Sequence, residues 1–180
     1  RRVGASGWVP ISTVLQALAQ RGHSLTAEEL WTMVADDPRR YELDLGAQDL
    51  GRTRALHGHS AGRSGSGRMA ALAASRSVGA ADPPPTLYHA TRARALGPIA
   101  RRGLLPMRRI FVHLSPTPDG TRSGNDLLVM VDTASLLEQH DVRMTASGLV
   151  VLCSCVPPEC IAGCRPLSAA GQAALDRLAA

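Results

Sequence analysis

The apolar positions of the first third of the chain predict two short helices. Gly22 ends an amphipathic helix whose apolar residues follow the i, i+3, i+4, i+7 spacing: Ile11, Val14, Leu15 and Leu18. Thr26, with Glu29 three residues later, forms a capping box that opens a second helix, and Pro38 stops that helix.

The hydrophobic spacing then changes to that of strands. Residues 41–45 alternate apolar and polar side chains, residues 46–51 supply a glycine-bounded loop, and residues 52–56 return as a second strand. Two short helices followed by a β-ribbon predict a winged-helix-like domain over residues 1–60, and a generic helical cap domain is the alternative.

Residues 61–85 contain few large apolar side chains and end on three prolines, so we interpret them as a linker. A short helix could form around residues 69–74, but nothing in the segment resembles catalytic machinery. We therefore place the domain boundary here, with a second domain over residues 86–180.

The second domain opens with two short apolar runs that each end on a histidine. One run leads into His89 and the other, residues 110–112, leads into His113, with an arginine-rich, helix-like segment between them. Each histidine stands where a strand would emerge from a sheet, so the two imidazoles could face one cleft.

The remaining apolar runs predict a compact α+β domain. Residues 127–132 have the length of a fully buried strand, residues 133–139 follow as a short helix, and residues 167–178 form a terminal helix. So few helices between the strands argue against a doubly wound parallel sheet. No G-x-G-x-x-G sequence is present, which disfavours a Rossmann nucleotide site.

Composition adds a charge preference. The chain has 180 residues, only 3% of them aromatic, and a formal net charge of +5. Arginine is the only basic residue besides histidine, because the chain has no lysine, and its planar fork favours bidentate recognition of phosphate. A nucleic acid or nucleotide partner is therefore indicated, although net charge alone proves neither.

Two further features bear on the class of protein. No apolar run approaches the roughly 20 residues of a membrane span, and no signal peptide is visible, so we expect a soluble cytoplasmic protein. The four cysteines are spaced C-x-C-x4-C-x3-C between Cys153 and Cys164, unlike the paired C-x-x-C of zinc sites. We expect no metal and free thiols, with a structural disulfide as the alternative.

Several blocks of the chain resemble one enzyme family, the RNA 2′-phosphotransferases, called KptA in bacteria and archaea. His89-Ala90-Thr91 resembles that family's His-Gly-Thr. Residues 103–115, GLLPMRRIFVHLS, match its Gly-Leu-x-x-Met-x-Arg-x-x-Val-His-Leu-Ser block position by position.

The other blocks occur in the family's order. Residues 54–60, RALHGHS, match Arg-Ala-x-x-Gly-His-Ser, and Gly120 with Arg122 precede a strand that an aspartate closes. Residues 146–152 resemble the family's penultimate strand, Asn-Gly-Val-x-Leu, with Ser147 in place of the usual asparagine. Residues 156–159 match Val-Pro-Pro-Glu. The resemblance covers both expected domains.

This resemblance implies a specific reaction. In the family, an internal RNA 2′-phosphate attacks the nicotinamide-bearing ribose carbon of NAD+, which expels nicotinamide and gives an ADP-ribosylated phosphate. The ribose 2″-hydroxyl then attacks that phosphate, giving RNA with a free 2′-hydroxyl and ADP-ribose 1″,2″-cyclic phosphate without a metal. We therefore expect a transferase with NAD as co-substrate and a 2′-phosphorylated RNA as substrate, a tRNA from splicing, with no protein partner implied.

The resemblance also implies where each substrate binds. Residues 86–180 would form an ADP-ribosyltransferase-like split β-sheet domain that holds NAD+, and residues 1–60 would bind RNA and its phosphate. Arg54 and Arg122 are the predicted catalytic residues, reaching the phosphate from different domains, with His59 and Ser60 beside Arg54. The predicted NAD contacts are His89, Ala90, Thr91, Arg109, His113 and Ser115.

One part of the family pattern is missing. A Leu-Arg-His, whose arginine and histidine are needed for phosphate transfer, should precede Gly7, but the chain reads Arg1-Arg2-Val3-Gly4 there. Either the segment lies upstream of residue 1, or Arg1 or Arg2 is its remnant. A full-length protein without it should accumulate ADP-ribosylated RNA.

Two alternatives stay open from the residues. One is an ADP-ribosyltransferase that acts on protein or on terminal nucleic-acid phosphates. Protein-modifying transferases generally need a late glutamate to activate the acceptor, and the only late glutamate here, Glu159, follows two prolines and looks structural. The other is a non-catalytic winged-helix module, which would bind duplexes in a salt-sensitive way and ignore NAD+.

Overall fold

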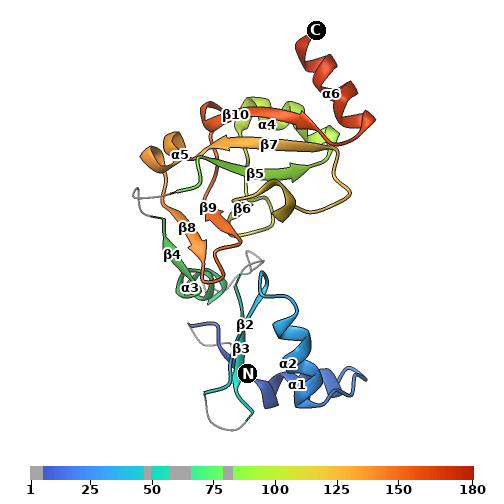
Figure 1. Cartoon of the computed structure of the whole chain (residues 1–180), viewed down its shortest axis with the longest axis vertical. Coiled ribbons are helices and arrows are strands. Elements are labelled where there is room, and N and C mark those ends of the chain that lie inside the picture. Colours follow the sequence, from blue (N-terminus) through green and yellow to red (C-terminus); the bar gives the residue numbers. More distant parts are fainter. Residues whose placement is uncertain (1–5, 47–49, 57–65, 79–82) are drawn as a thin grey trace. The chain divides into compact units, whose positions relative to one another are not determined.

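A computed structural model of the chain describes residues 6–46, 50–56, 66–78 and 83–180. The chain divides into two compact units (Figure 1). Unit 1 comprises Arg1–Arg76 with Thr145–Ser147, and unit 2 comprises Ser77–Met144 with Gly148–Ala180.

Unit 1 combines two helices with a small antiparallel sheet. The sheet has the order β1-β3-β2, and Tyr41 pairs with Ala55 across the hairpin predicted from the sequence. The elements are β1 (Val9–Pro10), α1 (Ile11–Ala19), α2 (Ala27–Ala35), β2 (Tyr41–Asp44), β3 (Arg52–Ala55) and α3 (Ser66–Ala73). Helix α3 lies inside the segment interpreted as a linker, near the place where a short helix was expected.

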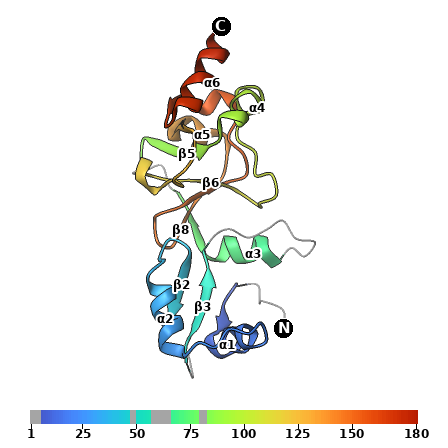
Figure 2. The same cartoon turned by 90° about the vertical axis from the view of Figure 1, so that its right-hand side faces the viewer.

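The two predicted helices of unit 1 are confirmed. Helix α2 runs alongside β2 (Figure 2). The buried side chains of this core are Ile11 of α1 and Leu30 and Val34 of α2. The capping box is also present: the Thr26 hydroxyl accepts a hydrogen bond from the Glu29 N–H at 3.2 Å, and the Glu29 carboxylate accepts one from the Thr26 N–H at 2.8 Å. Those bonds hold the pKa of Glu29 below its usual 4.5.

The second half of the chain forms two antiparallel sheets with helices around them. One sheet has the order β10-β7-β5 and the other β4-β8-β9-β6. The elements are β4 (Ser75–Ser77), β5 (Thr86–Thr91), a 3₁₀ helix η1 (Ala93–Ala95), α4 (Leu96–Arg102), β6 (Val112–Leu114), η2 (Pro118–Gly120), β7 (Leu127–Asp132), α5 (Thr133–Gln139), β8 (Val142–Thr145), β9 (Val151–Cys153), η3 (Pro158–Cys160), β10 (Ile161–Pro166) and α6 (Ala169–Ala179).

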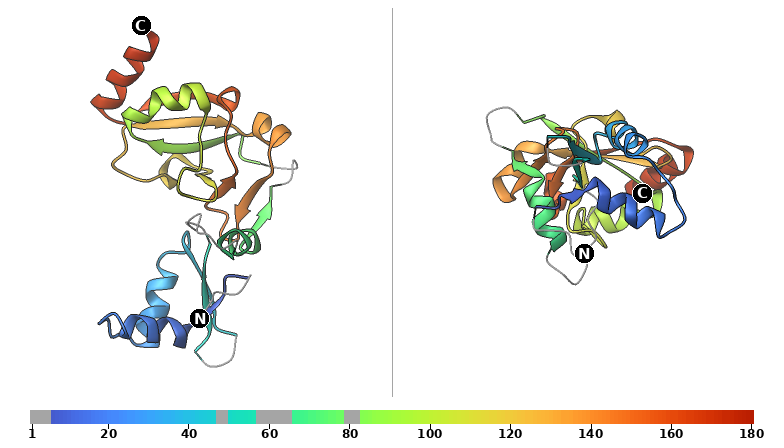
Figure 3. Two further views of the ribbon diagram at one scale, coloured as in Figure 1. Left: turned by 180° about the vertical axis from the view of Figure 1, so that it is seen from behind. Right: turned by 90° about the horizontal axis from the view of Figure 1, so that it is seen from below.

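Strand β7 lies at the centre of its sheet and of the main core. Val129 and Val131 are fully buried and pack with Leu87 of β5 and Ile99 of α4. Helix α4 lies across one face of this sheet, as the view from behind shows (Figure 3, left). Burying these aliphatic side chains supplies about 1.5–3 kcal/mol each, which fixes the strands that carry the predicted site.

Several predicted elements agree with the structure and one is wrong at its start. The strand over residues 127–132 and the helix over residues 133–139 form as expected. The strand predicted over residues 146–152 begins only at Val151, because Gly148, at φ 71°, lies in a turn that joins β8 to β9. The described residues thus form a mixed α and β structure with antiparallel sheets and six α-helices, as the α+β prediction requires at that level.

Within the described ranges, no helix is both long and apolar enough to span a bilayer.

Candidate active site

The two histidine-bearing strands meet edge to edge in unit 2. Tyr88 of β5 donates its N–H to the Ser115 carbonyl at 2.9 Å and accepts the Ser115 N–H at 2.8 Å, just beyond the end of β6. This bridge brings the His89-Ala90-Thr91 segment beside the His113-Leu114-Ser115 segment.

His89 is half-buried at this junction. Its Nδ1 lies 3.0 Å from the main-chain carbonyl oxygen of His113. Because a carbonyl oxygen can only accept, Nδ1 carries the hydrogen, and in the neutral ring Nε2 is left as an acceptor. This hydrogen bond ties His89 to the backbone of His113.

The electrostatics of the junction keep His89 neutral. Burial lowers the pKa of His89 below its usual 6.5, and the nearby positive charge of Arg122 lowers that pKa further, while the bond to the His113 carbonyl acts the other way. His89 and Arg122, two of the predicted site residues, are thus brought close enough to interact.

Arg122 extends from the loop between η2 and β7. Its side chain is exposed, and within the described part of the chain it makes no ion pair. Asn125 Nδ2 donates to the Arg122 carbonyl at 2.9 Å and so fixes the backbone of the loop. The guanidinium charge remains available for an anion.

A tight turn sets the start of this loop. The buried Ser115 hydroxyl donates to the Thr117 carbonyl at 2.6 Å and accepts the Thr117 N–H at 3.2 Å. Gly120 packs directly on that hydroxyl, and a β-carbon at Gly120 would overlap Ser115 Oγ. Ser115 therefore acts on the predicted site by shaping the loop that carries Arg122, in a role that its sequence position does not reveal.

Asp126 holds the other end of the loop and was not predicted. Its carboxylate accepts the Ala93 N–H at 2.9 Å and the Ser168 hydroxyl at 3.1 Å, while its own N–H donates to the Thr91 carbonyl at 2.9 Å. The Ala93 N–H is the main reason that the pKa of Asp126 lies below its usual 3.8. No sequence signal pairs Asp126 with Ala93, because the two are distant along the chain.

The other predicted NAD contacts lie in the same unit. Ala90 and Thr91 pair with Leu128 and Leu127 of β7, so both belong to the sheet that carries His89. Arg109 is exposed on the loop that precedes β6, where its N–H donates to the Pro106 carbonyl at 2.8 Å.

Arg54, the predicted catalytic residue of unit 1, is held on several sides. Its Nε donates to Glu42 Oε2 at 2.6 Å, its Nη2 lies 2.6 Å from the same oxygen, and its Nη1 donates to the Ala73 carbonyl at 3.0 Å. The guanidinium carbon also lies 4.6 Å from the centre of the Trp8 ring. Only 12% of the Arg54 side chain is exposed. His59 and Ser60, the predicted neighbours of Arg54, lie outside the described residues, as do Arg1 and Arg2.

The four cysteines of the chain lie in unit 2. All four cysteines are free thiols, and burial raises the pKa of Cys153 to about 11. Over the ranges that the structure describes, no group of three or more potential ligand side chains is placed to hold a metal ion.

Comparison with known proteins identifies relatives for most of the chain. The model of a family described as RNA 2′-phosphotransferase, Tpt1 / KptA family, matches residues 2–154. A probable RNA 2′-phosphotransferase of Streptomyces griseus is 35% identical over 164 residues, covering 85% of this chain and 80% of the relative. Proteins with the same name from Streptomyces coelicolor (37% identity, 79% and 74% covered) and Pyrobaculum aerophilum (33% identity, 86% and 68% covered) are also similar.

Proposed function

This chain belongs to the RNA 2′-phosphotransferase family, and on that premise we propose that it transfers an internal 2′-phosphate of RNA to NAD+. The RNA product carries a free 2′-hydroxyl. Relatives named as probable RNA 2′-phosphotransferases support the reaction class, and the resemblance of the sequence blocks supports NAD+ as the co-substrate, with spliced tRNA as the expected source of the phosphate.

One observation carries the proposal. An exposed guanidinium without an ion pair among the described residues, that of Arg122, lies close to a neutral imidazole, that of His89. A phosphate that reacts without a metal needs a fixed cation to hold its negative charge and to stabilise the charge of the transition state. Arg122 supplies that cation on a loop whose two ends are anchored.

The residues of unit 2 fit a dinucleotide diphosphate. Arg109 is an exposed cation suited to the diphosphate oxygens, and His89 Nε2 offers an acceptor to a ribose hydroxyl. NAD+ would supply the accepting ribose: a phosphate oxygen bonds to the ribose carbon that carries nicotinamide, and nicotinamide leaves. The ribose 2″-hydroxyl then displaces the RNA 2′-oxygen from the phosphate, which ends in ADP-ribose 1″,2″-cyclic phosphate.

The protein's own groups then have separate tasks. Arg122 binds and orients the phosphate, and neutral His89 accepts a hydrogen bond at Nε2 without adding a positive charge beside the ribose that loses nicotinamide. Burial of His89 preserves this neutral state near pH 7. Arg54 and His113 remain proposed members of the site, with Arg54 assigned to the phosphate.

We assign each unit to a fold family on the same basis. The β1-β3-β2 sheet with two helices supports a winged-helix-like unit 1, and the two antiparallel sheets of unit 2 support the split sheet of ADP-ribosyltransferases. The boundaries at residues 60 and 86 belong to this proposal.

The decisive experiment uses an RNA with one internal 2′-phosphate, incubated with the protein with and without NAD+. We expect NAD-dependent loss of the 2′-phosphate and stoichiometric release of nicotinamide. Arg122→Gln should abolish most of both, whereas Arg165→Gln, which removes another exposed arginine of unit 2, should not.

Other outcomes would point elsewhere. Nicotinamide release that depends on a protein acceptor, with the RNA phosphate untouched, would favour a protein-directed ADP-ribosyltransferase. RNA binding that is indifferent to NAD+, with no phosphate lost, would favour the non-catalytic module.

A further inference from the structure

The excess positive charge of the chain is concentrated in one short stretch. Residues 92–109 contain six arginines and no acidic residue. Without these six charges the formal net charge of +5 would become −1. A single segment of unit 2 therefore supplies the basic character of the protein.

The arginines of this stretch are exposed. Four of them lie on or next to the helical part, and we call them the arginine surface: Arg92, Arg94, Arg101 and Arg102. None of the four makes an ion pair with a described residue. Arginine surfaces that serve only solubility are commonly interspersed with carboxylates, which this stretch lacks.

The helix geometry places two of these side chains on one face. Helix η1 runs directly into α4, so Arg94 and Arg101 stand seven residues apart and lie roughly 10 Å apart along the axis. The intervening Leu96 and Ile99 are buried, which turns the face of Arg94 and Arg101 to solvent.

Small residues leave this face flat. A β-carbon placed on Gly97 would lie 3.6 Å from Arg101 Nη1, so the Arg101 side chain extends back over Gly97 toward the turn of Arg94. Gly97 and Ala100 offer no bulky side chain on this part of the helix. An extended anionic backbone can therefore approach the guanidinium groups closely.

Local helix stabilisation explains only part of this arrangement. Arg101 and Arg102 stand in the last turn of α4, where positive charge complements the helix dipole. Arg92 and Arg94 stand at the opposite end, where positive charge is unfavourable to the same dipole. The charge of Arg92 lies near enough to Asp126 to lower the pKa of that carboxyl, whereas Arg94 makes no ion pair with a described residue. The helix dipole therefore does not account for Arg94.

We propose that the arginine surface docks the sugar-phosphate backbone of RNA outside the reacting nucleotide. The inference rests on the proposed function for the identity of the polyanion. Contacts of this kind set affinity and register without reading sequence, so they would let the enzyme hold an RNA whose 2′-phosphate lies in different sequence contexts.

The test measures RNA binding separately from catalysis. A long single-stranded RNA without any 2′-phosphate is titrated against the full chain, without NAD+, over a series of salt concentrations. For the Arg94→Gln/Arg101→Gln variant we expect at least about tenfold weaker binding at low salt. The slope of log K against log salt should fall by about 1.4, the value for two lost phosphate contacts.

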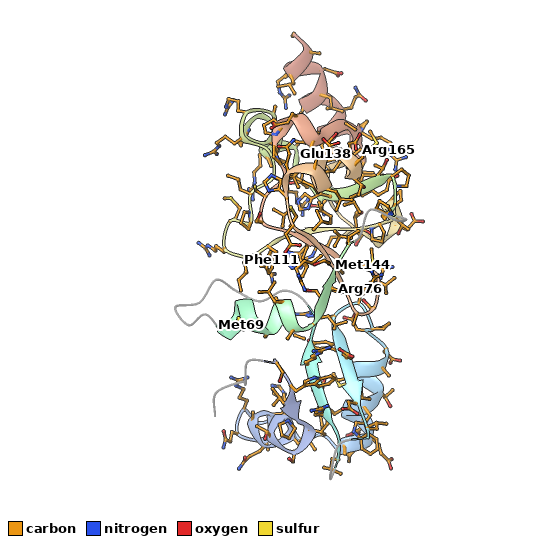
Figure 4. The ribbon with its side chains drawn as sticks, turned by 90° about the vertical axis from the view of Figure 1, so that its left-hand side faces the viewer. Met69, Arg76, Phe111, Glu138, Met144 and Arg165 are labelled. Atoms are coloured by element: carbon orange, nitrogen blue, oxygen red, sulfur yellow. The ribbon has the colours of Figure 1, made fainter. Side chains whose placement is uncertain are left out.

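A matched variant controls for net charge. Arg165 of β10, labelled in Figure 4, and Arg177 of α6 are exposed arginines of the same unit, so Arg165→Gln/Arg177→Gln removes the same charge elsewhere. This variant should retain most of the affinity. Equal losses in the two double variants would reduce the effect to net charge and overturn the proposal.

Measurements of turnover then test whether the arginine surface acts in the reaction. With 2′-phosphorylated substrates, the Arg94/Arg101 variant should raise KM for a long RNA while kcat and the KM of a trinucleotide stay unchanged. Unchanged binding and an unchanged KM for the long RNA would refute the proposed role of the arginine surface in RNA binding. If the wild type binds RNA through these residues but removes no phosphate, the proposed function fails and the surface stands.

Discussion

Arg54 and Arg122 were predicted for the same task, yet their surroundings differ. Arg54 is almost buried, paired with Glu42, bonded to the Ala73 carbonyl and stacked on Trp8. Arg122 is exposed on a loop and makes no ion pair with a described residue. A guanidinium whose donors already have partners stabilises the fold, whereas one without partners is ready for a ligand.

An arginine can stabilise the fold or bind a ligand, and the contacts of Arg54 and Arg122 favour a different role for each. Arg54 uses Nε, Nη1 and Nη2 within unit 1, so any phosphate contact by Arg54 has to use the hydrogens that remain on Nη1 and Nη2. We therefore expect replacement of Arg122 to act mainly on the reaction and replacement of Arg54 to act on stability as well.

Arg122→Gln should produce the largest effect. Removing one preorganised charge from a phosphoryl-transfer site lowers the rate by about 10²–10³-fold, or about 3–4 kcal/mol. The thermal midpoint of unfolding should stay the same, because the exposed side chain packs against little. Single-turnover rates and thermal melts measure both quantities. Arg122→Lys should recover only part of the rate, since lysine lacks the bidentate fork. Activity of Arg122→Gln within tenfold of the wild type would remove Arg122 from the mechanism.

Arg54→Ala should destabilise unit 1. The change leaves Glu42 without its partner and the Ala73 carbonyl without a donor, which costs about 1–3 kcal/mol. Urea unfolding of Arg54→Ala, Glu42→Ala and the double variant yields the coupling energy of the pair. We expect coupling above about 1 kcal/mol. A coupling near zero would mean that the ion pair is dispensable and that Arg54 is held for substrate alone.

Local sequence patterns predicted where several helices and strands lie, but only the structure shows which of them pair or pack together. The capping box of Thr26 and the buried run over residues 127–132 are encoded within a few residues, so their prediction was confirmed. The strand β10 was missed because Gly163 and Pro166 interrupt its pattern, although it pairs with β7 along most of its length.

In the candidate site, too, local patterns predicted residues but not their long-range contacts. The family-like blocks predicted His89 and Arg122 as site residues, and in the structure the charge of Arg122 acts on the pKa of His89, while their roles stay predictions. The contact of Arg54 with Ala73 and the anchor made by Asp126 join residues far apart in sequence, so no local pattern announces them. Arg54 lies on the predicted second strand of the hairpin, and its near-complete burial is visible only in the structure.

Gly120→Ala should lower activity through the position of Arg122. The added β-carbon overlaps Ser115 Oγ, so the turn that begins the Arg122 loop has to shift. We expect about a tenfold lower rate and a loss of about 1–2 kcal/mol in stability. Ser115→Ala in the same chain removes the overlapping oxygen and should restore part of the activity. If the double variant is no better than Gly120→Ala alone, the overlap with Ser115 does not explain the loss.

The smallest effect concerns the titration of His89. Its pKa in the folded protein lies below the ordinary 6.5, so between these two values the unfolded chain binds more protons. Stability should therefore fall as the pH drops from 6.5 to the folded-state pKa, and this dependence should be absent above 6.5. Urea unfolding across this range, compared with His89→Gln, isolates the contribution of His89.

Arg122 should contribute to that titration and a distant arginine should not. The charge of Arg122 is the second influence that lowers the pKa of His89, after burial. Arg122→Gln should accordingly raise the pKa of His89, measured by NMR of the imidazole ring, whereas Arg165→Gln should leave it where it is. Because burial remains in Arg122→Gln, the pKa should still lie below 6.5. A pKa that is the same in both variants would place Arg122 too far from His89 to share a substrate with it.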